Sequence, residues 1–459
     1  MLQKFDAIII GTGQAGPSLA GRLTSAGMKT AVIERKQFGG TCVNTGCTPT
    51  KALVASARAA YMARRGADFG VNLGGKISMD MKKVKQRKDE IVRKSNEGVG
   101  SWLRSMNNAT VFRGHGRFES PRTVRVDGEL LEADRIFINV GGRASVPPVA
   151  GLDTVPYLNN SSVMEVDFLP EHLLILGGGY IALEFGQMYR RFGSEVTLVQ
   201  RGERLLTQED DDIAKSVHEI LENEGIQVCT DTGDYRVENR NGKVAIQMKC
   251  HGESREVVGS HLLVATGRRP NTGDLGLDKA GVKVDNRGII EVDDQLRTNV
   301  EGIWALGDCN GKGAFTHTSY NDYEIVAANL LDNDPRRVSD RITTYALYID
   351  PPLGRAGQTE RQVRESGRKA LIATRPMTRV ARAVEKDETQ GFMKALVDAD
   401  SKRILGAAIL GVGGDEVIHS ILDVMYAKAP YTLIQRAMHI HPTVTELIPT
   451  MLADLKPLE

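Results

Sequence analysis

Two stretches of the chain repeat one pattern of apolar and polar positions. In residues 5–35 ("FDAIIIGTGQAGPSLAGRLTSAGMKTAVIER") and 172–206 ("HLLILGGGYIALEFGQMYRRFGSEVTLVQRGERLL"), a short apolar run precedes a glycine-rich turn, a mixed segment and a second apolar run. Short apolar runs bounded by glycine are typical of strands buried in a parallel sheet, and the mixed segment between them is typical of a helix. The pattern therefore predicts two strand–turn–helix–strand units.

The glycine turn of the first unit carries a more specific signal. Gly11, Gly13 and Gly16 form the spacing G-x-G-x-x-G, and Glu34 closes the second apolar run. In dinucleotide-binding folds such glycines let the backbone approach a pyrophosphate, and an acid about 20 residues further on binds a ribose hydroxyl. With strand, helix and acid all in place, we favour a dinucleotide site over a chance glycine turn.

The second unit repeats the turn but not the acid. Gly177, Gly179 and Ala182 hold the key positions, and Ala is tolerated at the third because only close packing is required there. Two arginines, Arg201 and Arg204, stand where a carboxylate would grip the ribose of NADH. Guanidinium groups bind a phosphate well, so we expect NADPH, with NADH as the alternative. The other interpretation is that both arginines belong to a solvated strand end.

Composition narrows the class of protein. The 459 residues suffice for about three domains, and 41% hydrophobic content with a formal charge of +1 argues against disorder. The near-neutral charge gives no electrostatic reason to expect nucleic acid or an acidic membrane as a partner. No apolar run reaches the ~18 residues that span a bilayer, and the N-terminus shows no signal-peptide pattern. We expect a cytoplasmic protein.

Two of the five cysteines lie close together, in "GGTCVNTGCTPTK". A structural zinc site usually needs four ligands in close pairs. Cys229, Cys250 and Cys309 form no second pair, and we interpret them as core or surface thiols. In the reducing cytosol, a close pair such as Cys42 and Cys47 is more often catalytic than structural. We therefore favour a redox-active pair.

The local sequence allows these two cysteines to meet. Five positions along a straight helix rise about 7.5 Å, more than the usual separation of disulfide-bonded residues. Gly46 permits the necessary distortion, and Pro49 suits the first turn of a helix over "KALVASARAAYMARR" (51–65). The positive end of that helix would favour a thiolate.

The two units and the cysteine pair together predict a route for electrons. A nicotinamide does not readily reduce a disulfide directly, because its hydride must be converted into thiol chemistry, whereas a flavin performs this conversion. We therefore expect FAD in the first unit and the nicotinamide cofactor in the second.

The chain resembles the class I pyridine-nucleotide disulfide oxidoreductases, which include dihydrolipoamide dehydrogenase, glutathione reductase and mercuric reductase. The resemblance covers essentially the whole chain. It rests on "GGTCVNTGCTPTK", "GGGYIALEF", "INVGGRASVPP", "LLVATGRRPN", "IWALGDCNG" and "HIHPTVTE". It implies an α/β fold with two doubly wound dinucleotide-binding domains, for FAD and NAD(P), and a C-terminal α+β dimerisation domain. It also implies cofactor contacts at Gly40, Thr41, Gly142 and Gly267.

The resemblance assigns roles around the cysteine pair. Cys42 would be the thiol that meets the substrate, and Cys47 the thiolate that lies against the flavin. Lys51 would sit near the reactive edge of the flavin and pair with Glu184, because a cation there stabilises the reduced anion. Two further residues are implied at the cofactors: Tyr180 as a gate over the flavin, with packing alone as the alternative, and Asp308 at the ribityl chain.

The C-terminal segment supplies a candidate proton shuttle. Glu446 follows His441 by five residues, and a carboxylate bonded to one imidazole nitrogen fixes the tautomer and raises the pKa of the other. By resemblance, His441 of the partner subunit reaches Cys42. The resemblance therefore implies a homodimer whose interface is the C-terminal third of the chain.

We predict four segments. Residues 1–150 form the FAD-binding domain, 151–267 the NAD(P)-binding domain, 268–340 a return to the flavin, and 341–459 the dimerisation domain. A helix is expected near "MKKVKQRKDEIVRKS", with its charges on a solvated face.

The electron acceptor is the least determined feature. The chain ends in "TMLADLKPLE" without the vicinal cysteines of familiar mercuric reductases, and it shows no obvious glutathione-binding signature. A small disulfide is the first candidate, and a metal-ion reductase of the mercuric or Cu(II) type is the alternative. A flavoprotein whose redox state is read by a partner is a third. The dyad of His441 and Glu446 favours an enzyme, since a sensor needs no proton shuttle.

Overall fold

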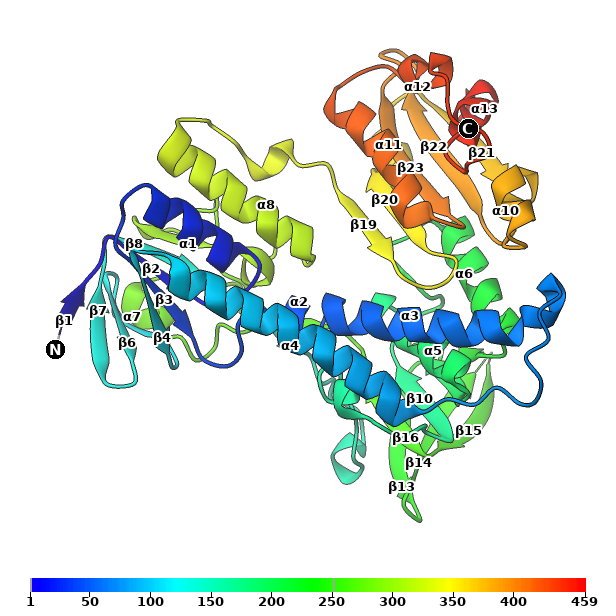
Figure 1. The fold of residues 1–459 in the computed structure, drawn as a ribbon, viewed down its shortest axis with the longest axis horizontal. Coiled ribbons are helices and arrows are strands. Elements are labelled where there is room, and N and C mark those ends of the chain that lie inside the picture. The colour runs from blue at the N-terminus through cyan, green and yellow to red at the C-terminus, as the bar shows by residue number, and fades with distance from the viewer. Residues whose placement is uncertain (1, 251) are drawn as a thin grey trace.

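The computed structural model describes residues 2–250 and 252–459. The first repeat unit forms a parallel sheet with strand order β18-β8-β2-β3-β4. Its strands are β2 (Ala7–Ile10), β3 (Thr30–Glu34), β4 (Ala109–Arg113), β8 (Arg135–Ile138) and β18 (Ile303–Ala305). The central strands β2 and β3 are buried along their whole length, as their unbroken apolar sequence predicts. On one face, α1 (Ala15–Ser25) lies beside α8 (Thr316–Ala327) (Figure 1).

The second repeat unit forms a smaller parallel sheet, with order β12-β11-β10-β16. These strands are β10 (His172–Leu176), β11 (Glu195–Val199), β12 (Gln227–Cys229) and β16 (His261–Val264). The helix α5 (Tyr180–Phe192) connects β10 to β11, as predicted for a strand–turn–helix–strand unit, and α6 (Asp211–Asn223) connects β11 to β12. A separate antiparallel sheet consists of β13 (Arg236–Arg240), β14 (Lys243–Cys250) and β15 (Glu253–Gly259).

The chain then returns to the first sheet. β9 (Gly142–Ala144) leaves that sheet and pairs antiparallel with β17 (Arg268–Pro270), which comes back to it. β18 next joins the edge of the first sheet, with Ile303 opposite Ile136. A small neighbouring sheet completes this region with β1 (Leu2–Lys4), β5 (Arg117–Ser120), β6 (Thr123–Val126) and β7 (Glu129–Glu132), near the short helix α7 (Leu277–Ala280).

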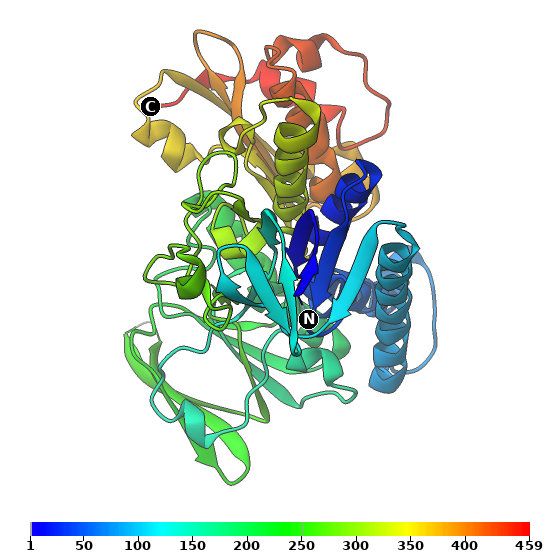
Figure 2. The ribbon, with the colours of Figure 1, turned by 90° about the vertical axis from the view of Figure 1, so that its left-hand side faces the viewer.

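The C-terminal region is a six-stranded antiparallel sheet, ordered β19-β20-β23-β22-β21-β24. Its strands are β19 (Thr344–Leu347), β20 (Leu353–Gly357), β21 (Ala370–Pro376), β22 (Phe392–Asp398), β23 (Ile404–Leu410) and β24 (Lys456–Pro457). Its helices are α9 (Glu360–Glu365), α10 (Ala381–Glu385), α11 (Gly414–Tyr426), α12 (Thr432–Arg436) and α13 (Leu447–Ala453). This region stands apart from the two parallel sheets in both ribbon views (Figures 1 and 2).

Two long helices cross the middle of the molecule, α3 (Cys47–Arg64) and α4 (Met81–Ser105). α3 packs against both α4 and α5 (Figure 1). Leu53 of α3 shares one buried cluster with Leu183 of α5 and Leu353 of β20. The helix α3, which begins at Cys47, is therefore held by α5 of the second repeat unit and by β20 of the C-terminal sheet. These contacts fix Cys47 relative to both regions.

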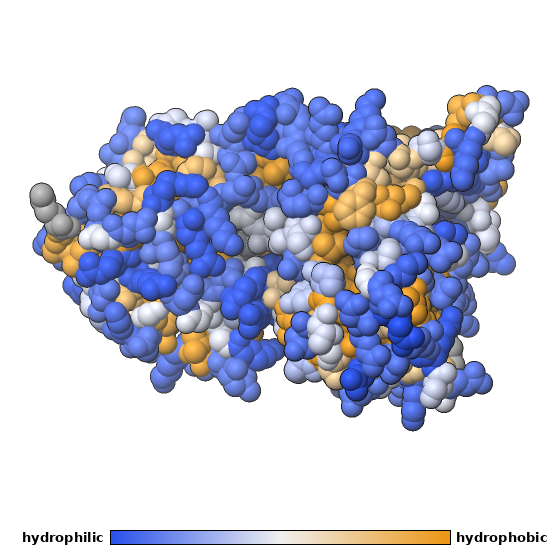
Figure 3. Space-filling model, turned by 90° about the horizontal axis from the view of Figure 1, so that it is seen from below, coloured by the Kyte–Doolittle hydropathy of each residue, from blue (hydrophilic) through white to orange (hydrophobic). Residues whose placement is uncertain are grey.

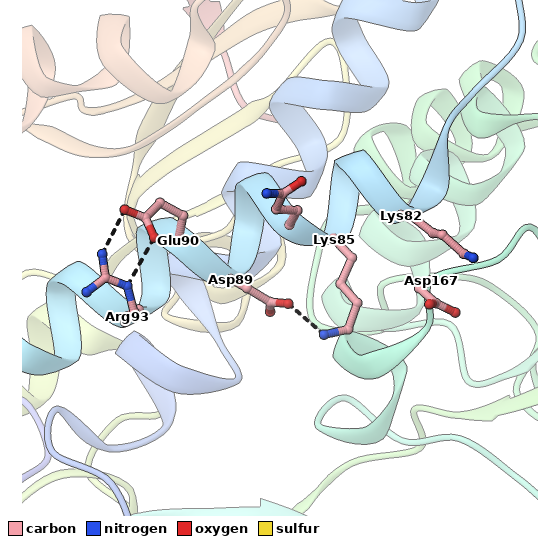
Figure 4. Close-up of a pocket in the computed structure, with 7 residues that line it drawn as sticks. Lys82, Lys85, Asp89, Glu90, Arg93 and Asp167 are labelled. Atoms are coloured by element: carbon pink, nitrogen blue, oxygen red, sulfur yellow. Dashed lines mark hydrogen bonds and ion pairs between the residues drawn. The ribbon is translucent and has the colours of Figure 1, made fainter.

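The predicted charged helix is α4, and one of its faces is rich in ion pairs. Arg93 pairs with Glu90 at 2.8 Å, and Lys85 pairs with Asp89 at 2.6 Å. Figure 4 shows these side chains pointing away from the helix around a shallow hollow that Asp167 also lines. Pairs at these spacings stabilise a helix modestly. Most of the charge run lies on a solvated face as predicted, but Lys88 is only 3% exposed and donates to the Met164 carbonyl oxygen at 2.8 Å.

Among the described residues, no helix is both long and apolar enough to cross a membrane. The face seen from below is mostly hydrophilic, with hydrophobic residues gathered in smaller patches (Figure 3).

Candidate redox-active site

The two cysteines lie at a break between two helices. Cys42 is within α2 (Gly40–Asn44), and Cys47 is the first residue of α3. Gly46 breaks the helix with φ −128° and ψ −118°, and a Cβ added there would lie 2.8 Å from the carbonyl oxygen of Thr41. Only glycine permits this close approach. The prediction that the cysteines lie on a distorted segment is confirmed.

The two thiols differ sharply in acidity. The pKa of Cys47 is lowered to about 6: the hydrogen bond from the Cys42 thiol is the largest cause, and contact with Thr316 and the charge of Lys51 act in the same direction against the effect of burial. The Thr316 Oγ1 atom lies 3.0 Å from the Cys47 sulfur. The same hydrogen bond and burial raise the pKa of Cys42. At neutral pH the pair is therefore one thiolate, Cys47, and one thiol, Cys42.

Lys51 and Glu184 form an ion pair beside the cysteines. The Lys51 ammonium lies 2.8 Å from one Glu184 carboxylate oxygen and 3.1 Å from the other. It follows Cys47 by one helical turn, so both side chains share a face of α3. The Tyr348 backbone N–H donates to the Glu184 carboxylate at 3.0 Å. The Lys51 ammonium nitrogen also lies over the Tyr348 ring, 4.3 Å from the centre of the ring. The predicted pairing is present, and Tyr348 is a support that the sequence did not reveal.

The first glycine turn is packed tightly against Asn139. A Cβ at Gly11, where φ is +102°, would lie 2.3 Å from the Asn139 carbonyl oxygen, and one at Gly13 would lie 2.8 Å from its side-chain oxygen. The Gly16 N–H donates to that same side-chain oxygen at 3.1 Å. A Cβ at Gly40 would lie 2.9 Å from the Gly13 Cα, so the turn also touches the start of α2, next to Thr41.

These approaches exclude side chains at Gly11, Gly13 and Gly40, which leaves the backbone bare where a pyrophosphate would approach, and the residues present fit FAD. Asn139 lies in "INVGG", so its motif was recognised although its bracing contact was not.

Glu34 and Asp308 lie at the ends of two strands of the first sheet. Glu34 is 8% exposed and accepts hydrogen bonds from the Thr12 N–H at 3.1 Å and the Thr12 hydroxyl at 2.6 Å. The Lys36 N–H donates to its other oxygen at 2.7 Å. Glu34 therefore fixes the glycine turn, in addition to any bond to a cofactor. At Asp308, burial raises the pKa of the carboxyl group, and the neighbouring Arg268 opposes this.

The paired turns between the sheets bring further predicted residues together. The Arg268 guanidinium donates to the Gly142 carbonyl oxygen at 2.7 Å and lies 3.7 Å from the Asp308 carboxylate. Gly267, just before it, has φ +141°, which only glycine adopts easily. Gly142, Gly267 and Asp308 thus belong to one corner of the fold, and Arg268 is the residue that joins them.

The second glycine turn is more open. A Cβ at Gly177, where φ is +122°, would lie 2.4 Å from the Ala265 carbonyl oxygen, whereas one at Gly179 would meet no atom within 4 Å. Ala182 is fully buried, in keeping with a packing role. Of the two arginines, Arg201 is exposed, while Arg204 forms an ion pair with Asp211. No pattern in the sequence indicates that Arg204 already has a carboxylate partner.

The C-terminal dyad is formed within the chain. The His441 Nδ1 atom lies 3.0 and 3.1 Å from the two carboxylate oxygens of Glu446. The His441 side chain is 75% exposed, and its neighbours Met438 and Ile440 are 100% and 79% exposed. Within the part of the chain that the structure describes, no hydrogen bond or ion pair joins His441 to either cysteine of the pair.

Comparison with known proteins gives the family. A family model described as pyridine nucleotide-disulphide oxidoreductase matches residues 5–322, and the dimerisation-domain model of the same family matches residues 343–452. The chain belongs to this family. It is therefore an oxidoreductase that binds FAD and a pyridine nucleotide, and its C-terminal region is the family's dimerisation domain.

Several relatives are similar over almost the whole chain. The probable pyridine nucleotide-disulfide oxidoreductase RclA of Escherichia coli is 36% identical, over 99% of this chain and 100% of its own length. A mercuric reductase of Bacillus cereus is 32% identical, over 95% of this chain and 70% of its own length. The solved Cu(II) complex of the HOCl-induced flavoprotein disulfide reductase RclA superimposes with a TM-score of 0.89 at 35% identity, covering 98% of this chain and 99% of that one.

Proposed function

We propose that this enzyme passes electrons from NADPH, by way of its FAD, to the pair of Cys42 and Cys47 and from there to a small disulfide. The observation that carries the proposal is the setting of Cys47, which begins α3 after the break at Gly46, lies 3.0 Å from the Thr316 hydroxyl and precedes the Lys51–Glu184 ion pair by one helical turn. In this setting the pKa of Cys47 is lowered to about 6, with the hydrogen bond from Cys42 as the largest cause. Bound FAD supplies the conversion of hydride into electrons for thiol chemistry.

The residues of the chain divide the remaining work. Cys47 is held as thiolate at the start of α3, where the helix N-terminus, Thr316 and Lys51 all favour the anion. Glu184 orients Lys51 so that the ammonium can stabilise negative charge on a reduced flavin. Cys42, which remains a thiol until a base takes its proton, is the group that attacks the substrate disulfide.

A matched pair of serine variants tests these roles. Cys47→Ser should abolish the long-wavelength absorbance that a thiolate gives against an oxidised flavin, whereas Cys42→Ser should show it without any reductant. Both variants should lose disulfide turnover and still be reduced by NADPH. Absorbance at long wavelength that survives in Cys47→Ser would rule out the assignment.

We propose that His441 of the partner subunit completes the site. Its bond to Glu446 leaves the second imidazole nitrogen free to move a proton at Cys42. Support comes from exposure, because Met438 and Ile440 beside it are almost wholly exposed in the single chain and would be covered in a homodimer. Mass measurement of the purified protein by light scattering tests for the dimer.

We propose NADPH as the preferred reductant. Arg201 is exposed at the end of β11, where a 2′-phosphate would be bound, whereas Arg204 is engaged by Asp211. The exposed Arg201 is therefore the main phosphate ligand that we expect, and Arg204 contributes only by giving up its present partner. The ratio of kcat/KM for NADPH and NADH measures the preference.

A metal-ion reductase is the second candidate. It is favoured by the similarity to mercuric reductases and to RclA, which has been solved as a Cu(II) complex. Transfer of electrons to a bound metal ion expels no thiolate and needs no general acid. His441→Ala should therefore cripple disulfide turnover but spare reduction of Cu(II) or Hg(II). A His441→Ala enzyme that keeps near wild-type rates with every disulfide tried and also reduces Cu(II) or Hg(II) normally would rule out the disulfide reductase and leave the metal-ion reductase.

We also propose the four-segment division at about residues 150, 267 and 340. The antiparallel pair of β9 and β17 and the pairing of β18 with β8 support it, because they carry the chain out of the first sheet and back. A cytoplasmic location is proposed on the need for a reducing compartment around five free cysteines.

A further inference from the structure

Tyr180 shares a buried carboxylate with a second tyrosine from another part of the fold. The Tyr180 hydroxyl donates to the Glu209 Oε1 atom at 3.0 Å, and the Tyr345 hydroxyl donates to the same atom at 2.7 Å. Tyr180 begins α5 directly after the second glycine turn, Glu209 lies between β11 and α6, and Tyr345 is on β19. One oxygen atom therefore joins the nicotinamide-side fold to the dimerisation domain.

Glu209 is held in place from the C-terminal side. Its side chain is fully buried, and its Oε2 atom lies 3.6 Å from the guanidinium of Arg355, which is itself 1% exposed. Asp210 is anchored by the same guanidinium at 3.3 Å and by the backbone N–H groups of Glu360 and Arg361 at 3.0 and 3.2 Å. The Glu209 carboxylate is therefore held in a fixed position, and Tyr180 is hydrogen-bonded to it.

Hydrogen bonds to this carboxylate come from the two phenols. Among the described residues, the Glu209 Oε2 atom has no hydrogen-bond partner. A buried carboxylate gains much from each hydrogen bond and loses heavily when one is removed. Loss of Tyr180 leaves Tyr345 as its remaining donor, so the bond can be broken without leaving the anion wholly unbonded.

The same aromatic group reaches the redox pair. The Tyr345 ring stacks on Phe315 with centroids 5.3 Å apart, and the Tyr180 ring lies 5.6 Å from Tyr345 and 6.2 Å from Phe315. Thr316, the next residue, contacts the Cys47 sulfur at 3.0 Å. Tyr180 is therefore packed between the nicotinamide turn and the cysteine that faces the flavin.

We propose that Glu209 is a latch that holds Tyr180 closed, that Tyr345 keeps this carboxylate bonded when Tyr180 leaves, and that Tyr180 must release Glu209 each time a nicotinamide enters. This inference rests on the proposed electron route from NADPH to FAD and on the gate over the flavin that the family resemblance implies for Tyr180. Binding of the nicotinamide competes with the latch. The apparent Kd for the cofactor therefore equals the Kd of the open enzyme divided by the fraction of enzyme that is open. Glu209 and Tyr345 are positioning residues, since they act through Tyr180.

The two tyrosines predict opposite results. Tyr180→Phe keeps the ring but removes the bond to Glu209, so the gate opens more easily. The apparent Kd for NADPH should fall by about tenfold, with the limiting rate of flavin reduction little changed. Tyr345→Phe leaves Tyr180 as the last donor to the carboxylate, so opening becomes harder and the apparent Kd should rise. Damage to packing alone would move both variants in the same direction.

The experiment is stopped-flow reduction of the flavin in the holoenzyme against NADPH concentration. Tyr323→Phe is the matched control, because its hydroxyl donates to the Tyr320 hydroxyl, 3.3 Å away on α8, and within the described chain makes no hydrogen bond to Tyr180, Glu209 or Tyr345; it should behave as the wild type. Tyr180→Ala tests the gate separately and should also lower the apparent Kd.

The outcomes separate the two ideas. If Tyr180→Ala changes the concentration dependence but Tyr180→Phe and Tyr345→Phe do not, the gate stands and the latch is overturned. Shifts of both phenylalanine variants in one direction also overturn the latch. If Tyr180→Ala has no effect, the gate implied by the family resemblance fails and the latch fails with it, while the electron route of the proposed function still stands.

Discussion

The two dinucleotide-binding folds have similar sequences but differ in how the protein itself fills their glycine turns. In the first, Cβ atoms at Gly11 and Gly13 would lie 2.3 and 2.8 Å from atoms of Asn139. In the second, Gly177 is equally confined, but a Cβ at Gly179 would meet nothing within 4 Å. A turn braced by its own protein suits a cofactor that stays bound, and an open turn suits one that enters and leaves.

The side chains beside the two glycine turns differ in the same way: those of the first fold are buried and bonded within the protein, and those of the second are more open. Glu34 is already bonded to the turn through Thr12 and is almost fully buried. The second fold offers instead an exposed Arg201 and a tyrosine, Tyr180, whose hydrogen bond can be exchanged. The comparison teaches that one motif serves a resident or an exchanging cofactor according to what packs around it. Four predictions test this division.

The largest effect should lie outside both folds. If the two dinucleotide-binding folds only deliver electrons, His441→Ala should leave flavin reduction by NADPH unchanged. It should slow disulfide turnover by about 10²–10⁴-fold, because the leaving thiolate is no longer protonated. Glu446→Gln should show a milder loss through poorer orientation of the imidazole. Stopped-flow measurement of each half-reaction, on variants of verified dimer mass, checks this. Slower flavin reduction in His441→Ala would break the separation.

Alanine at two glycines tests the comparison directly. Gly11→Ala should lower the free energy of unfolding by about 2–4 kcal/mol and reduce FAD content, because the new methyl would strike Asn139 at a positive φ. Gly179→Ala should cost less than about 1 kcal/mol, since space is open and its φ is −93°. It should instead raise KM for NADPH by obstructing the pyrophosphate. Chemical denaturation, FAD absorbance and steady-state kinetics provide the readouts, and equal destabilisation would contradict the contrast.

Removal of a positive charge at the second fold should have a smaller effect. Arg201→Ala should lower kcat/KM for NADPH by the equivalent of about 1.5–3 kcal/mol, the value of a hydrogen bond to a charged group, and should spare NADH. Arg204→Ala is the matched control and should lose less, because its guanidinium is already paired with Asp211. Equal losses with both cofactors would mean that Arg201 supports the fold rather than the phosphate.

The smallest effect concerns the acidity of Cys47. In the reduced enzyme, the long-wavelength absorbance of the Cys47 thiolate against the flavin should disappear as pH falls through about 6, because the thiolate is protonated there. Lys51→Met removes a nearby positive charge, which disfavours the anion, so the midpoint should move upward by less than about one pH unit. The shift is small because the hydrogen bond from Cys42 is the larger cause. Spectrophotometric titration of both proteins gives the midpoints, and a downward shift in Lys51→Met would contradict the proposed contact.

Much of the fold was predictable from the sequence because its signals are local. The apolar runs gave β2, β3, β10 and β11, and the glycine spacing gave the turns between them. The break before Cys47 followed from Gly46, and the pairing of Lys51 with Glu184 followed from the family resemblance. In each case a residue type was needed at a fixed spacing, which is information that a linear sequence contains.

The sequence by itself determined the two dinucleotide folds, the close cysteine pair and the family to which they belong. Only the tertiary structure decided which partners those residues find. Arg204 is paired with Asp211, Asn139 braces the first turn, and Tyr345 meets Tyr180 on Glu209. The Tyr345–Glu209 contact joins residues 136 positions apart. Contacts of this kind depend on how sheets and helices pack, and no local pattern of hydrophobic and polar positions specifies them.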